Sequence, residues 1–136
     1  MKLSTLLVPS KTVSLEYPGM PGFEVSLSFL SREEMVKIRK KATKVTIKQR
    51  QPVEELNDEL FLQLYVQNTV KGWKGLKLKY VAQLVPIDLA EIKDVEKELE
   101  YDEDNALSLI KNSSDFDSWV SEVVTDLQNF QKTSGN

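Results

Sequence analysis

Residues 101–130 carry the strongest pattern in the chain and limit its possible folds most. Beyond position 115, apolar residues recur at spacings of three and four, as they do along one face of an amphipathic α-helix. This stripe comprises Phe116, Trp119, Val120, Val123, Val124, Leu127 and Phe130. We expect it to form a helix of about four turns that is capped by Ser114, the first residue of the capping-box-like sequence Ser114–Asp117. A helix capped by Asp102 should precede it, from Glu103 to about Asn112, so the sequence predicts a C-terminal amphipathic helical hairpin.

The N-terminal part has the period of β-strands instead. Thr12–Tyr17 and Phe23–Phe29 alternate polar and apolar residues, which predicts two strands that each bury one face. Between them, the prolines and glycines of Pro18–Gly22 favour a turn. We therefore expect a β-hairpin over residues 11–30.

The middle of the chain is predicted to be mostly helical. Ser31 and Glu34 form a capping box, so a helix should run from Ser31 to about Ala42. Lys44–Gln51 is predicted to be a short strand or an extended arm, and the strand is preferred. A further helix should begin near Asn57 and reach about Lys71, before Gly72. The secondary structure of two segments is left open. Residues 81–85 fit a strand or a helical turn, and residues 88–104 fit a short helix or irregular chain.

These expectations add up to an α+β fold in one domain over residues 1–136. An N-terminal antiparallel β-hairpin or small sheet is followed by four to five helices. The hairpin covers 11–30, the helical region 31–131, and a frayed polar tail 132–136.

Composition removes several classes of function. The chain has no histidine and no cysteine, so the commonest general base, thiol nucleophile and transition-metal ligands are missing. The paired carboxylates of Asp102–Asp104 and Asp115–Asp117 lie at expected helix starts, where negative charge is favourable, and capping is preferred to a metal or acid–base role. We therefore expect no enzyme, no cofactor and no metal site. No apolar stretch is long enough to span a membrane, and Met1–Ser10 does not have the length and flanks of a signal peptide.

Charge is divided unevenly along the chain. Residues 1–80 carry 14 Lys/Arg and 8 Asp/Glu, whereas residues 81–136 carry 4 and 13. A chain charged +6 in one part and −9 in the other can pair with copies of itself or with two different partners, although both faces can also simply be solvated. The Lys/Arg-rich segments 32–50 and 71–79, with Trp73 and Tyr80, are compatible with a nucleic-acid groove. The acidic sequence pI of about 5.1 disfavours that function.

Three short motifs, in this order and spacing, resemble the tail assembly chaperones of long-tailed bacteriophages and prophages. They are Leu30–Glu34, Gly72–Leu76, and Asp104–Leu107 leading into Phe116 and Trp119. The similarity extends from about Pro18 to Phe130. The stretch after Trp73 is richer in lysine than the family pattern.

The resemblance implies a protein that binds the tape measure protein before the tail tube polymerises around it. Such a chaperone keeps that long helical chain soluble and can also recruit tail tube protein. It acts in the bacterial host cytoplasm and is expected to be absent from the mature virion. The alternatives are a structural tail or head–tail connector protein and, disfavoured by the pI, the nucleic-acid-binding module.

A partner with apolar helical seams would need apolar side chains to dock against. The sequence offers one such face on the helix after Asn57, another on the C-terminal stripe, and a tryptophan between two glycines. The candidate partner-binding residues are Phe61, Leu64, Tyr65, Trp73, Trp119, Val123 and Phe130.

Overall fold

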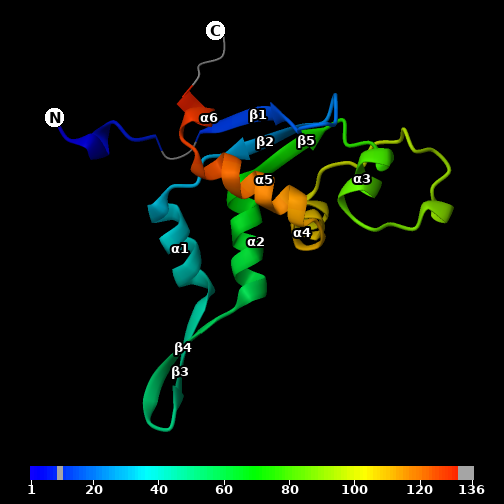
Figure 1. Cartoon of the computed structure of the whole chain (residues 1–136). Helices are drawn as coiled ribbons and strands as arrows, with labels where there is room; N and C mark the ends of the chain where they lie inside the picture. The colour runs from blue at the N-terminus through cyan, green and yellow to red at the C-terminus, as the bar shows by residue number, and fades with distance from the viewer. Residues whose placement is uncertain (9–10, 132–136) are drawn as a thin grey trace.

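A three-stranded antiparallel sheet forms the base of the structure, a computed structural model that describes residues 1–8 and 11–131. Its strands are β1 (Thr12–Glu16), β2 (Glu24–Ser28) and β5 (Val70–Lys74), in the order β1-β2-β5. The fold is α+β, as predicted (Figure 1). The tail predicted at 132–136 lies outside the described residues.

The alternation in the first two strands explains how the sheet packs. Val13 pairs with Leu27, and Leu15 with Val25, so one face of the predicted hairpin is apolar. Val25 and Leu27 are fully buried because β2 is the central strand. The opposite face carries polar side chains, among which Thr12 and Ser28 share a hydrogen bond of 2.7 Å. A sheet with one polar face requires its helices on the other.

Three helices cover the apolar side of the sheet. They are α2 (Asp58–Thr69), α4 (Glu103–Asn112) and α5 (Ser114–Thr125). Both α2 and α5 contact β2, and α4 packs against α2 and α5, so the predicted C-terminal helical hairpin is confirmed (Figure 1). One hydrophobic cluster joins this sheet to the helices.

Side-chain caps fix the starts of four helices. α1 (Arg32–Ala42) begins as predicted, with the Ser31 hydroxyl accepting from the amide of Glu34. Asn57 caps α2 and Asp102 caps α4 in the same way. The cap of α5 is Ser113, one residue earlier than the predicted Ser114; its hydroxyl accepts from the amide of Phe116 at 3.1 Å. Ser113 is buried, whereas Ser114 is exposed.

A second, separate hairpin is the main difference from the predicted fold. The strand expected near 44–51 is present as β3 (Thr43–Lys48), but it pairs with an unpredicted strand, β4 (Gln51–Leu56). Two features hid β4 in the sequence. Pro52 disfavours a strand, and the loop residues Gln49 and Arg50 have positive φ values of 52° and 67°, a conformation in which Gly or Asn is expected.

Tertiary pairing also corrects the helical region predicted for 31–131, which contains three strands. α2 ends at Thr69 rather than near Lys71, because Val70–Lys74 joins β2 as the edge strand β5. The stripe predicted as one helix to Phe130 is interrupted after Thr125, and the single turn α6 (Gln128–Gln131) returns Phe130 to the core.

The two open segments take different forms. Leu78–Leu84 is a short helix, α3, while 88–104 is irregular apart from the 3₁₀ turn Leu89–Glu91 and the start of α4. The described residues thus hold six α-helices instead of four to five, because α3 and α6 are added to the longer ones.

Gly75 provides a test of how β5 leaves the sheet. It has φ +75°, and an added Cβ would overlap the carbonyl oxygen of Gly22. We expect Gly75→Ala to lower the free energy of unfolding by more than about 2 kcal/mol, as measured by urea denaturation. Gly72→Ala is the matched control, because its Cβ would meet only the Ser26 side chain at 3.9 Å. Equal stability losses in the two variants would contradict this close approach.

The position of the α5 cap can be tested with adjacent serines. Ser113→Ala should lower the free energy of unfolding by about 1–2 kcal/mol, because the buried backbone amide of Phe116 loses its hydrogen-bond acceptor. Ser114→Ala should change stability by less than about 0.5 kcal/mol, because Ser114 is an exposed first-turn residue. Thermal and urea unfolding of both variants measure the difference. A larger loss for Ser114→Ala would place the cap where the sequence alone suggested.

Candidate partner-binding surface

Three of the seven candidate partner-binding residues lie in the core. Tyr65, Val123 and Phe130 are at most 7% exposed. The Tyr65 hydroxyl shares a hydrogen bond of 3.0 Å with Ser121 Oγ, and burial raises the pKa of this phenol. Phe130 packs edge-on against Phe29. These three side chains stabilise the fold and present no surface for docking.

The other four candidates are half-buried, and each is engaged within the chain. The Arg39 guanidinium lies 5.5 Å from the centre of the Phe61 ring, and Leu64 packs at the edge of the core. Trp73 Nε1 donates to the carbonyl oxygen of Leu99 at 2.9 Å, and Trp119 meets Tyr17 edge-on.

Three of the four lysines in segment 71–79 form ion pairs with neighbouring carboxylates. Lys74 pairs with Glu24, and both Lys77 and Lys79 pair with Glu96, at 2.9 and 2.7 Å. Hydrogen bonds from the two lysines lower the pKa of the Glu96 carboxyl.

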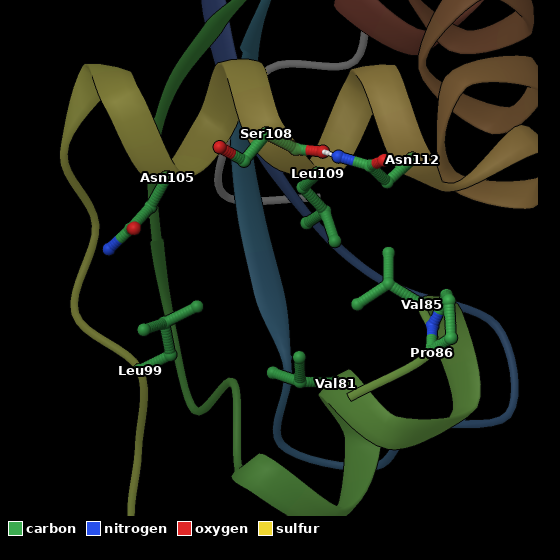
Figure 2. A pocket seen from close by; sticks show the side chains of 8 residues that line it. All are labelled: Val81, Val85, Pro86, Leu99, Asn105, Ser108, Leu109 and Asn112. Atoms are coloured by element: carbon green, nitrogen blue, oxygen red, sulfur yellow. Dashed lines mark hydrogen bonds between the residues drawn. The ribbon is translucent and has the colours of Figure 1, made fainter. Parts of the chain in front are cut away.

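A groove of about 330 Å³ lies between α4 and the segment that contains α3. Its apolar wall is built by Val81, Val85, Pro86, Leu99 and Leu109. Figure 2 shows the apolar side chains around this space and the polar residues along the α4 side, where the Asn112 side chain donates to the carbonyl oxygen of Ser108. The polar residues are Asn105, Ser108 and Asn112, which follow one face of α4 at spacings of three and four.

Contacts at the edge of the sheet hold this groove in shape. Leu99 lies in an irregular segment, but its amide donates to the carbonyl of Leu76 at 2.7 Å and its carbonyl accepts from Trp73. The hydroxyl of Tyr101 donates to the carbonyl of Val70 at 2.9 Å. The Asn105 amide donates to the carbonyl of Glu100. The groove wall therefore depends on β5, the strand that the sequence did not reveal.

Sequence patterns indicated only part of the groove. Leu109 lies in the helix predicted from Glu103 to about Asn112, and Leu99 lies in the segment 88–104 whose structure was left open. What the sequence could not show is that α3 and Leu99 stand apart from α4, because this depends on the pairing of β5 with β2.

The second prominent surface is the hairpin of β3 and β4, residues 43–56, which we call the arm. It projects beyond the ends of α1 and α2 that lie far from the sheet (Figure 1). Val45 and Ile47 are 60% and 78% exposed. Their alternation predicted a strand correctly, but period-two spacing cannot tell a buried face from an exposed one.

Neither a cluster of metal ligands nor a membrane-spanning helix is seen in the part of the chain that the structure describes. No group of three or more Asp and Glu side chains lies close enough to hold a metal ion. No helix there combines the length and apolar character that crossing a membrane requires.

A protein-family comparison gives the origin of the chain. The family model described as "YdaY prophage protein" matches residues 28–135. The chain belongs to this family. The YdaY match covers both the arm and the groove, and it begins at the end of β2. Searches of curated proteins and of solved structures gave no match. This is therefore a phage or prophage protein. The resemblance of the sequence motifs implied the same origin.

Proposed function

We propose that this prophage protein is a tail assembly chaperone that binds the tape measure protein, keeps it soluble and assists assembly of the tail tube. The proposal joins the resemblance of the three sequence motifs to the prophage family of the chain. The observation that carries it is the groove between α3 and α4, which gives a concave apolar surface to a protein expected to bind helices.

The groove has the chemistry of a helix-binding site. Apolar side chains form its wall, and the amides and hydroxyl of α4 line one side, so a bound amphipathic helix could bury its apolar stripe and keep its polar face near water. A tape measure protein exposes long stripes of this kind before the tube encloses it. Covering one would prevent that chain from associating with itself.

The charge near the groove indicates which kind of partner helix it would prefer. Glu100, Asp102, Glu103 and Asp104 lie between the groove residues Leu99 and Asn105, and all four are exposed. Carboxylates beside an apolar groove favour a helix whose stripe is flanked by lysine or arginine. We propose such a segment of the tape measure protein as the binding partner.

Of the sequence-based candidates, Phe61, Leu64, Trp73 and Trp119 remain proposed secondary contacts because they are partly exposed. Trp73 also supports the groove through Leu99, so loss of its side chain should weaken binding indirectly. Catalysis, a cofactor and a metal have no part in this proposal.

A co-expression experiment tests the groove. The wild-type chain should keep a fragment of the tape measure protein of the same prophage in the soluble fraction. Ser108→Arg, at an exposed position on the groove, should reduce the soluble fragment at least about tenfold by occupying the site. Ser118→Arg makes the same change at an exposed position of α5 outside the groove and should behave as wild type.

Circular dichroism should show that both arginine variants fold as the wild type does. If Ser108→Arg still keeps the fragment soluble, the groove is not the binding site. If the wild-type chain binds no part of the tape measure protein, the chaperone function itself is wrong.

Particle composition separates a chaperone from a structural tail or connector protein. We propose that the protein acts in the host cytoplasm and leaves before the tail is complete. Mass spectrometry of purified virions should then detect tail tube and tape measure proteins but not this chain, while lysates of induced cells contain it. A fixed number of copies in every virion would favour the structural alternative.

A further inference from the structure

The three-stranded sheet has two edge strands, β1 and β5, and the chain covers only one of them. Along β5, the hydroxyl of Tyr101 donates to the carbonyl of Val70, and just beyond the strand the amide of Leu99 donates to the carbonyl of Leu76. The segment that contains Leu99 and Tyr101 therefore lies along that edge. Among the described residues, no segment pairs with the outer side of β1.

Every second residue of β1 turns its backbone away from β2. The amide of Tyr17 donates to the carbonyl of Phe23, and the amide of Phe29 donates to the carbonyl of Lys11, so the odd-numbered residues bond to β2. In antiparallel pairing the residues between them direct their N–H and C=O groups outward. They are Thr12, Ser14 and Glu16. Within residues 1–8 and 11–131 these outward groups have no hydrogen-bond partner.

β1 carries few of the features that keep an edge strand from pairing with another strand. Lysine, proline and β-bulges usually serve this purpose. Thr12–Glu16 contains no lysine and no proline, and its register with β2 is regular. The side chains of Val13 and Leu15 are only half-buried, so part of their apolar surface is available at the edge.

Neighbouring elements leave this edge accessible. α6 contacts β1, but Phe130 of α6 packs against Phe29, which alternation places on the same face of the sheet as Leu27. α6 therefore belongs to the layer of helices and does not cover the edge. The N-terminal residues Met1–Val8 lie beyond the start of β1 (Figure 1).

We propose that β1 pairs antiparallel with β1 of a second copy, about a two-fold axis at Ser14, so that one sheet runs through both copies. In this register Ser14 is opposite Ser14 of the second copy, and Thr12 is opposite Glu16. The N–H and C=O groups of all three outward residues then have partners. Val13 is opposite Leu15 on the apolar face, and each covers the exposed part of the other.

The polar side chains are complementary in the same register. Thr12 and Ser28 share one hydrogen bond, so one of their two hydroxyl hydrogens stays free to donate. Glu16 accepts from the amide of Gly22 with Oε1, which leaves Oε2 as an acceptor for that hydroxyl across the junction. No like charges are brought into opposition.

Other registers are less favourable. Sliding the two strands toward the turn would set Thr12 opposite Pro18, which has no N–H, and then set the two Glu16 carboxylates opposite each other. Sliding them the other way takes Glu16 beyond the end of the partner strand. The register centred on Ser14 is the one that pairs all of β1.

Both grooves stay open in such a dimer. The strand order β1-β2-β5 places the junction at one edge of the sheet, whereas Trp73 and Tyr101 attach the groove wall at the other. The two grooves would thus lie at opposite ends of the joint sheet. In a clause that rests on the proposed function, one dimer could hold two segments of the same tape measure chain.

Sedimentation velocity of the purified full chain, with no other protein present, tests the junction. The wild type should pass from monomer to dimer as its concentration rises and form nothing larger, because a two-fold junction is closed. Ser14→Lys and Ser14→Glu each set like charges opposite each other at an exposed position, so each should dimerise at least about tenfold more weakly. A 1:1 mixture of the two variants should restore the dimer, because lysine then faces glutamate.

Controls separate the edge from other surfaces. Gln83→Lys and Gln83→Glu make the same charge changes at an exposed position of α3 and should dimerise as the wild type does. Hydrogen exchange of the outward amides of Thr12, Ser14 and Glu16 should slow as the wild type dimerises and stay fast in Ser14→Lys. The amides of Val13 and Leu15, which face β2, should be protected in both.

Three outcomes would overturn the proposal. They are a wild-type chain that stays monomeric at all concentrations, a Ser14→Lys variant that dimerises normally, and a mixture that stays monomeric although circular dichroism shows both variants folded. If the Ser14 variants do not fold, wild-type hydrogen exchange still decides, because fast outward amides in an associated state exclude the edge. Failure here leaves the tape measure assay unaffected, since the two experiments have separate readouts.

Discussion

Packing around Phe23 is the interaction on which the rest of the structure depends. This fully buried ring follows the Pro18–Gly22 turn and lies within 6.5 Å, between ring centres, of Tyr17, Trp73 and Phe116. Those three residues belong to the first hairpin, to β5 and to α5, so one side chain joins segments distant in sequence. Aromatic pairs of this kind each contribute about 0.5–1.5 kcal/mol beyond the area they bury. Loss of this side chain would leave a cavity where the sheet meets its helices.

The same packing reaches the groove through two further residues. Trp73 meets Tyr101 edge-on, with 5.1 Å between ring centres, and donates to the carbonyl of Leu99. Tyr101 in turn donates to the carbonyl of Val70. These two hydrogen bonds attach the irregular segment around Leu99 to β5. An exposed, highly charged stretch thus becomes a fixed wall opposite α4. The groove owes its shape to the sheet, although no strand residue lines it.

How far the sequence predicted the structure depended on the range of the interactions involved. The first hairpin, the starts of α1, α2 and α4, and the C-terminal helical pair follow from local pattern and capping, and all are present. β5 was predicted as the end of a helix and a turn, because its pairing with β2 spans more than forty residues and Gly72 resembles a helix stop. β4 was missed because Pro52 and the Gln49–Arg50 loop contradict the usual signals of a hairpin. Of the seven candidate contacts, the three buried ones show the limit of helical periodicity, which marks an apolar face without telling whether the core or a partner covers it.

The arm has no evident task within its own chain. The amide of Asn57 donates to the carbonyl of Ala42 at 2.8 Å, so the end of α1 and the start of α2 already meet at its base. A loop of a few residues would connect two such helices. The chain instead extends into twelve paired strand residues that expose Val45 and Ile47 and bury little against the rest of the fold. Ordering these residues costs conformational entropy that the core offsets little, so the arm is held chiefly by its own strand pairing and by the ion pair between Lys48 and Glu55.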